Sequence, residues 1–90
     1  MDIDSIRTQI DELDNQLLDI FNRRAALALQ IGEIKKERQL AVYDPKREQR
    51  IFARMQQANK GPLDNSAIVR LFERVIDESR SLERILTKGK

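Results

Sequence analysis

Apolar side chains recur at alternating steps of four and three residues along the N-terminal part of the chain. The series runs Ile6, Ile10, Leu13, Leu17, Ile20, Leu27, Ile31 and Ile34. Alternation of this kind is the heptad seam of a long amphipathic helix, here over residues 3–38. At about 1.5 Å per residue this helix is about 50 Å long, more than so short a chain covers with its own core. We therefore expect a second chain to lie along it.

Proline and glycine divide the rest of the chain into two shorter helices. Asp44 followed by Pro45 is a typical helix start, and Gly61 with the proline after it ends that helix. Apolar residues return at helical spacing from Ile68 onward. The sequence thus predicts helices over about residues 3–38, 45–60 and 64–86. We expect one all-α domain, a three-helix protomer with a long first helix.

Composition limits the chemistry that this chain can perform. Hydrophobic residues make up 40% of it, with only three Phe, one Tyr and no Trp, so the interior consists mainly of Leu, Ile and Ala. The chain has no cysteine and no histidine, which excludes thiolate nucleophiles, disulfides and a histidine base. Any reaction must therefore use lysine, arginine, carboxylates or hydroxyls.

The opening residues MDIDSIRTQI have neither the basic start nor the apolar run of a secretory signal. No later stretch is apolar for long enough to cross a bilayer. We therefore expect a cytoplasmic protein.

The net charge of +2 conceals an uneven distribution. Residues 1–21 carry six acids against Arg7, whereas residues 22–54 carry nine bases against four acids. A basic middle favours an anionic partner. Nucleic acid is disfavoured because no aromatic stacking surface, zinc motif or glycine-rich loop accompanies the basic residues.

Arg24 interrupts the first seam at a position that requires an apolar side chain. Burying a guanidinium without a partner costs several kcal/mol, a large part of the stability of a small domain. Arg24 therefore needs an anion.

The other two helices also place polar groups beside their apolar positions. Ser79 occupies the seam of the third helix, with Glu83 beside it one turn later. In the second helix Glu48, with Arg47 adjacent, lies one turn before the apolar side. In one interpretation these groups pair only with one another and with Arg24. In the other they share a small anionic ligand, because the full set has more cations than internal pairing can match: Arg24, Lys35, Arg47, Glu48, Ser79 and Glu83. The remaining bases are better explained as a solvated surface: Arg23, Lys36, Arg38, Lys46 and Arg50.

Arg7 is about 25 Å from Arg24 along the first helix, beyond the reach of a shared ligand. If Arg7 serves a pocket, that pocket belongs to a neighbouring chain. Antiparallel packing of two first helices would bring this about by symmetry.

Three segments together carry a family resemblance: IRTQIDELDNQLLDIFNRRAALALQIGEIKK, DPKRE and VIDESRSLE. They resemble the all-helical class of chorismate mutases over nearly the whole chain. The resemblance implies an intertwined homodimer with two equivalent active sites. It also implies the Claisen rearrangement of chorismate to prephenate, on the route to phenylalanine and tyrosine, without a metal or organic cofactor.

The resemblance implies a role for each candidate residue. Arg24 and Arg7 of the partner subunit would bind the carboxylate of the enolpyruvyl side chain. Arg47, helped by Ser79, would bind the ring carboxylate. Lys35 would contact a carboxylate and the ether oxygen. Glu48, with the backbone near Asp44, would bind the ring hydroxyl. Glu83 would contact the ether oxygen.

A [3,3] rearrangement transfers no proton and needs no nucleophile, so positioning and fixed electrostatics suffice. Glutamate donates a hydrogen bond to an ether oxygen only when it is protonated. We hypothesise that Glu83 acts as a neutral acid. The competing interpretation is that it pairs with a neighbouring base and leaves catalysis to Lys35.

Two other functions are compatible with these residues. An isochorismate pyruvate lyase of the same fold uses a similar cationic pocket. A noncatalytic helical dimer, acting as a regulatory or scaffolding module, would instead neutralise Arg24 with its own carboxylates.

Overall fold

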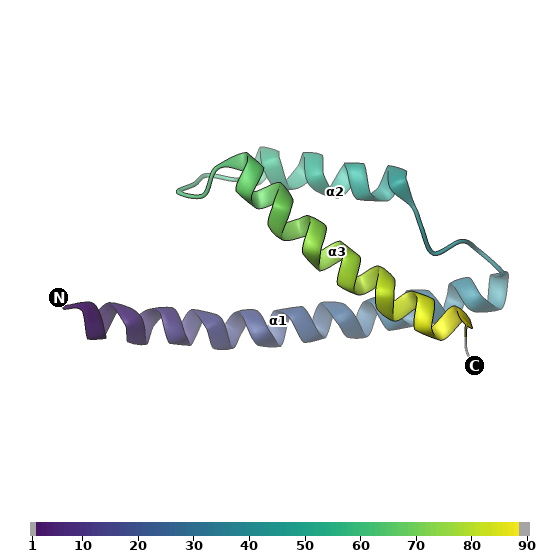
Figure 1. The fold of residues 1–90 in the computed structure, drawn as a ribbon, viewed down its shortest axis with the longest axis horizontal. Helices are drawn as coiled ribbons and strands as arrows, with labels where there is room; N and C mark the ends of the chain where they lie inside the picture. The colour runs from purple at the N-terminus through teal and green to yellow at the C-terminus, as the bar shows by residue number, and fades with distance from the viewer. Residues whose placement is uncertain (1, 89–90) are drawn as a thin grey trace.

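The structure is a computed structural model that describes residues 2–88. The described chain forms three helices, α1 (Ile3–Arg38), α2 (Pro45–Ala58) and α3 (Asn65–Lys88), and contains no strand (Figure 1). The predicted all-α fold with a long first helix is confirmed.

Local hydrogen bonds explain where the helices begin and end. The carboxylates of Asp2, Asp44 and Asp64 each accept from the backbone amide three residues later, at 2.8, 3.1 and 2.8 Å. Such caps satisfy amides that have no partner within the helix. At the other end of α1, Gln39 adopts a left-handed conformation with φ 57°, which closes the last turn.

The sequence pattern predicted that the second helix ends near residue 60. In the structure α2 ends at Ala58. The reason is the side chain of Asn59, which organises the turn that follows. Its amide donates to the carbonyl of Leu63 at 2.8 Å and to Asn65 Oδ1 at 2.9 Å, and its oxygen accepts from the amide of Gly61 at 3.0 Å. These bonds favour a turn over further helix before Gly61 is reached.

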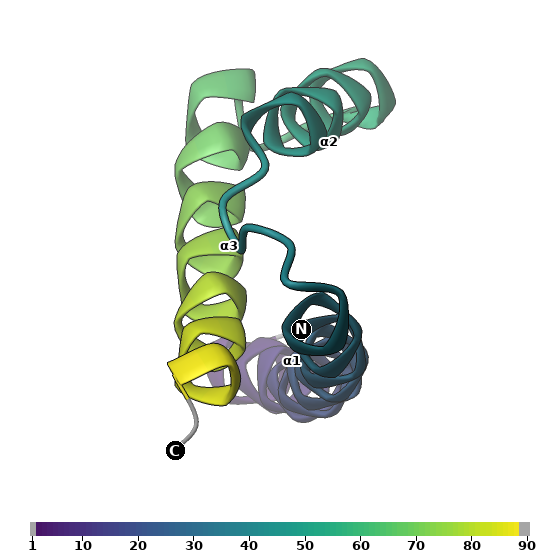
Figure 2. The ribbon, with the colours of Figure 1, turned by 90° about the vertical axis from the view of Figure 1, so that its right-hand side faces the viewer.

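α3 is the element that joins the fold. It crosses α1 and also packs against α2, whereas α1 and α2 do not pack against each other (Figure 2). The described chain measures 55 × 26 × 14 Å, and its buried apolar core consists of Ala28, Ile51 and Ile76. So thin a core leaves much of the apolar surface in contact with solvent.

The N-terminal half of α1 extends beyond the other helices (Figure 1). Its apolar side chains are exposed, with Leu13 at 58% and Ile10 at 50%. We call the following residues the apolar stripe: Ile6, Ile10, Leu13, Leu17 and Ile20. The last two also line a groove of ≈ 620 Å³ between α1 and α3, together with Phe21, Leu71, Phe72, Val75 and Leu82. Within the described residues, no helix is both long enough and apolar enough to cross a membrane.

Candidate active site

A second cavity, of ≈ 430 Å³, lies where the three helices come together. Its volume falls within the range of about 300 to 1,000 Å³ that is common for small-molecule sites. Its apolar walls are Leu27, Ala28, Ile31, Val42, Ile51 and Ile76. Four cationic side chains, three acidic side chains and one hydroxyl complete the lining: Arg24, Lys35, Arg47, Arg80, Asp44, Glu48, Glu83 and Ser79.

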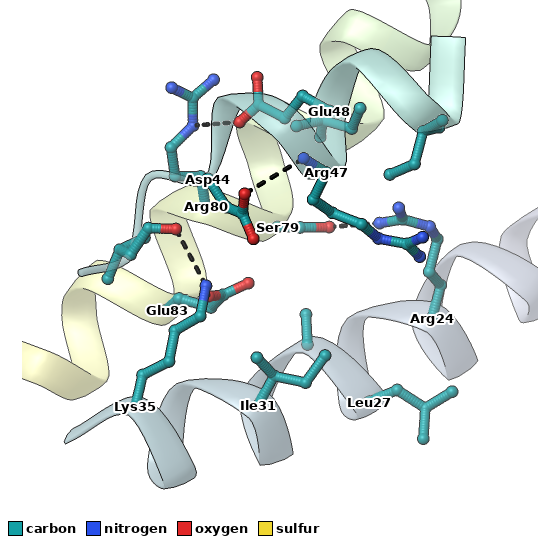
Figure 3. Close-up of a pocket in the computed structure, with 14 residues that line it drawn as sticks. Arg24, Leu27, Ile31, Lys35, Asp44, Arg47, Glu48, Ser79, Arg80 and Glu83 are labelled. Atoms are coloured by element: carbon teal, nitrogen blue, oxygen red, sulfur yellow. Dashed lines mark hydrogen bonds and ion pairs between the residues drawn. The ribbon is translucent and has the colours of Figure 1, made fainter. Parts of the chain in front are cut away.

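Each helix contributes polar groups at the spacing of its own turns. Arg24 and Lys35 are three turns apart on α1, and the start of α2 contributes Arg47 and Glu48. Figure 3 shows Arg24 and Arg47 toward one end of the cavity and Lys35 toward the other. The two ends differ in how their charges are balanced.

At the first end Arg24 has a neutral partner. Its Nη1 donates to Ser79 Oγ at 2.6 Å, and that hydroxyl donates to the carbonyl of Val75 at 3.1 Å. Burial lowers the pKa of Arg24, the positive charges of Arg47 and Arg54 lower it further, and the negative charge of Glu83 opposes them. Within residues 2–88 neither Arg24 nor Arg47 forms an ion pair with a carboxylate.

At the other end the charges are paired. Lys35 Nζ donates to Glu83 Oε1 at 3.0 Å and to the carbonyl of Val42 at 3.0 Å. The two side chains are only 17% and 11% exposed. The internal-pairing interpretation therefore describes Lys35 in this structure but does not describe Arg24.

Glu48 has a partner that the sequence interpretation missed. Its Oε2 lies 3.7 Å from Nε of Arg80, which also lines the cavity. A signal was available, since Arg80 is four residues after the buried Ile76 and therefore on the same face of α3. Arg80 does not itself interrupt the apolar seam, so that criterion does not select it.

The arrangement suits an anion better than a metal ion. Within the described residues no three acidic side chains gather in the way that a metal site requires. Two arginines without carboxylate partners, above an apolar wall, instead form a site for a small anionic molecule.

Residues 6–84 match the protein family described as chorismate mutase type II. The chain belongs to this family. The resemblance inferred from its motifs is thereby confirmed.

Two curated relatives illustrate the similarity. The bifunctional chorismate mutase/prephenate dehydratase of Neisseria gonorrhoeae is 43% identical over 81 residues, which is 90% of this chain and 22% of that protein. The chain thus spans about a fifth of the length of that relative. The chorismate mutase of Methanocaldococcus jannaschii is 31% identical over 80 residues, 88% of this chain and 81% of that protein.

Solved structures of the family have the same fold. Chorismate mutase from Thermus thermophilus (form II) has a TM-score of 0.90 at 32% identity and covers 91% of this chain and 93% of its own. The enzyme from Helicobacter pylori, solved in complex with prephenate, has a TM-score of 0.88 at 33% identity, with 98% and 96% covered.

Seven of the eight residues singled out from the sequence line this cavity: Arg24, Lys35, Asp44, Arg47, Glu48, Ser79 and Glu83. The eighth, Arg7, lies on α1 outside the cavity lining. Seventeen residues separate it from Arg24, about 25 Å along the helix axis. Its contribution from a partner subunit stays a prediction.

Proposed function

We propose that this chain catalyses the rearrangement of chorismate to prephenate. One carbon–oxygen bond breaks and one carbon–carbon bond forms within a single dianionic molecule, so no proton, electron or second substrate is required. The observation that carries the proposal is the end of the cavity where, among the residues that the structure describes, Arg24 and Arg47 have no carboxylate partner. A substrate with two carboxylates supplies the missing charge.

Arg24 is oriented by a hydrogen bond within the chain. Its bond to Ser79 uses one nitrogen of the guanidinium and leaves other N–H groups for a carboxylate. In the proposed complex Arg24 binds the carboxylate of the enolpyruvyl side chain, and Arg47 binds the ring carboxylate. Ser79 helps Arg47 by turning its hydroxyl proton from the carbonyl of Val75 to that carboxylate. Two fixed carboxylates restrict a flexible substrate to the folded conformation from which it reacts.

Lys35 is placed to act on the departing ether oxygen. Its ammonium is held by Val42 and Glu83 in a mostly buried site, where fixed charge stabilises a developing anion more strongly than in water. Glu48, with the backbone near Asp44, accepts from the ring hydroxyl. Glu83 approaches the ether oxygen, to which it donates a hydrogen bond only in its protonated form.

We further propose that the working unit is an intertwined homodimer. The apolar stripe and the groove beside it are exposed in a single chain, and a second copy of α1 would cover both. Antiparallel packing would bring Arg7 of the partner subunit toward Arg24. We place the reaction in the cytoplasm, in the synthesis of phenylalanine and tyrosine.

The activity is tested by incubating the purified chain with chorismate and with isochorismate in separate reactions. Consumption is followed by absorbance and the products are identified by mass spectrometry. Prephenate from chorismate is the expected result. Salicylate and pyruvate from isochorismate alone would assign the lyase activity, and no turnover of either would favour a noncatalytic module.

Sharing of the active site is tested with Arg7→Ala and Arg24→Ala. Each variant alone should be nearly inactive. After mixed unfolding and refolding, half of the chains form heterodimers if pairing is random, and each heterodimer contains one intact site. Failure of activity to recover, with heterodimers demonstrated by native mass spectrometry, would exclude donation of Arg7.

A further inference from the structure

We infer that Arg80 is a positioning residue that holds the carboxylate of Glu48 in the orientation in which it meets the substrate hydroxyl. The inference rests on the proposed mutase activity and adds a residue to it. It begins from the contacts of the Arg80 guanidinium, which neither the apolar pattern nor the motifs singled out.

The guanidinium of Arg80 is held from three directions. Its Nη2 donates to Asp77 Oδ1 at 2.6 Å, one turn earlier on α3. Its Nε lies 3.7 Å from Glu48 Oε2 on α2. Its Cζ lies 5.2 Å from the ring centroid of Tyr43, in the segment that joins α1 to α2. The side chain is only 22% exposed.

These contacts matter because, within the described chain, α3 is the helix on which α2 packs. α2 packs on α3 and not on α1, so its pocket residues reach the cavity through the α2–α3 contact alone (Figure 2). Within residues 2–88, the pair Glu48–Arg80 is the ion pair that joins these two helices. Figure 3 shows Arg80 beside Glu48, across the cavity from Ile31 on α1.

Electrostatics gives a second reason for the pair. A carboxylate that faces a dianionic substrate repels it unless a cation lies close by. Arg80 supplies that charge for Glu48, which can then accept from a neutral hydroxyl. Arg80 thereby acts on the substrate through Glu48.

Arginine suits this position better than lysine. Nε and Nη2 of one planar group face Glu48 and Asp77, while the Cζ of that group lies over the ring of Tyr43. A lysine ammonium is a point charge without this planar geometry. We therefore expect Arg80→Lys to recover only part of the activity that Arg80→Gln loses.

The test compares Arg80→Gln with Arg70→Gln. Arg70 is an exposed arginine on the same helix and bonds only within that helix, to Ser66 at 3.1 Å. We expect kcat/KM for chorismate to fall about tenfold in Arg80→Gln, within the usual range for coupled neighbouring side chains, and to stay at the parent value in Arg70→Gln.

A double-mutant cycle separates positioning from a general loss of stability. If Arg80 acts through Glu48, the variant Glu48→Gln with Arg80→Gln is at most about twofold worse than Glu48→Gln alone. A full tenfold further loss in the double variant would overturn the inference, as would an unchanged Arg80→Gln.

Folding is checked by circular dichroism and thermal unfolding. If Arg80→Gln does not fold, Asp77→Asn decides instead, because it loosens Arg80 at an exposed carboxylate outside the cavity lining. We expect Asp77→Asn to lower kcat/KM about threefold. The same change should have no effect in a chain that already carries Glu48→Gln. No loss would overturn the inference.

An inactive parent chain overturns the proposed function and this inference with it, whereas an active parent with unaffected variants overturns this inference alone.

Discussion

The cavity and the apolar stripe depart from ordinary packing in opposite ways. In the cavity, charged groups such as Arg24 and Lys35 are withdrawn from solvent among apolar walls. On the stripe, leucine and isoleucine are in contact with water over a surface that no other part of the described chain covers. Both arrangements are unfavourable for an isolated protomer.

The difference indicates what each region lacks. Partly buried cations without carboxylates require an anion, and an exposed heptad seam requires another apolar surface. A small dicarboxylate fits the first and a second copy of the chain fits the second. Changes confined to one region should therefore affect ligand chemistry or assembly selectively, and the following predictions test that division from the largest effect to the smallest.

Leu13→Glu should disrupt assembly. Burying a leucine is worth about 1.5 to 3 kcal/mol, and a symmetric dimer loses two of them, so association should weaken by about 3 to 6 kcal/mol. Sedimentation velocity should then show monomers at concentrations where the parent is dimeric. Activity should disappear as well, since Arg7 no longer reaches the other subunit.

The neighbouring change Glu12→Gln serves as the control and should leave assembly unaltered. An unchanged sedimentation coefficient for Leu13→Glu would remove the stripe as an interface.

Lys35→Ala should lower kcat by about a hundredfold, since one oriented donor at a developing charge is worth about 3 kcal/mol. The variant should remain folded because alanine is a good helix former. Steady-state kinetics with chorismate measures the first expectation and circular dichroism the second. The matched control is Lys36→Ala, an exposed neighbour that should keep full activity. Equal losses in both variants would contradict the role given to Lys35.

Glu83 should make activity depend on pH. If the protonated carboxyl donates to the ether oxygen, activity falls as pH rises through its titration in the complex, by at most about tenfold per pH unit for one proton. Glu83→Gln donates at any pH and should give a flat profile. Equally flat profiles for parent and variant would instead favour a lasting Lys35–Glu83 ion pair.

Arg24→Leu should have the smallest effect on the stability of the fold, although it removes the proposed binding group. A lowered pKa means that the folded state disfavours the charged form of Arg24. At neutral pH the side chain is nevertheless charged, so its charge reduces stability. Chemical denaturation should show an unfolding free energy that is unchanged or raised by up to about 1 kcal/mol.

Ligand binding provides the second measurement on this variant. A dicarboxylate such as prephenate should raise the Tm of the parent but not that of Arg24→Leu. The exposed neighbour Arg23→Leu should respond to ligand as the parent does. A marked loss of stability in Arg24→Leu would indicate that the arginine serves the fold.

The sequence alone determined the helices and the polar residues that interrupt their apolar seams. Capping by Asp44 and the start at Pro45 depend on a few adjacent residues, and the heptad period is also a local property. The helix start and the seam can therefore be recognised without a structure. Arg24 was recognised as a candidate because it interrupts that period. The end of α2 was misjudged by two residues because side-chain bonds from Asn59, and not Gly61 alone, form the turn.

Only the tertiary structure decided which polar groups meet. Arg24 bonds to Ser79, 55 residues away, and Lys35 to Glu83, 48 residues away. Partners at such separations depend on where α3 crosses α1, which the period of neither helix specifies. The packing of α2 on α3 brings Arg80 to Glu48, and within the described chain Arg47 has no carboxylate partner.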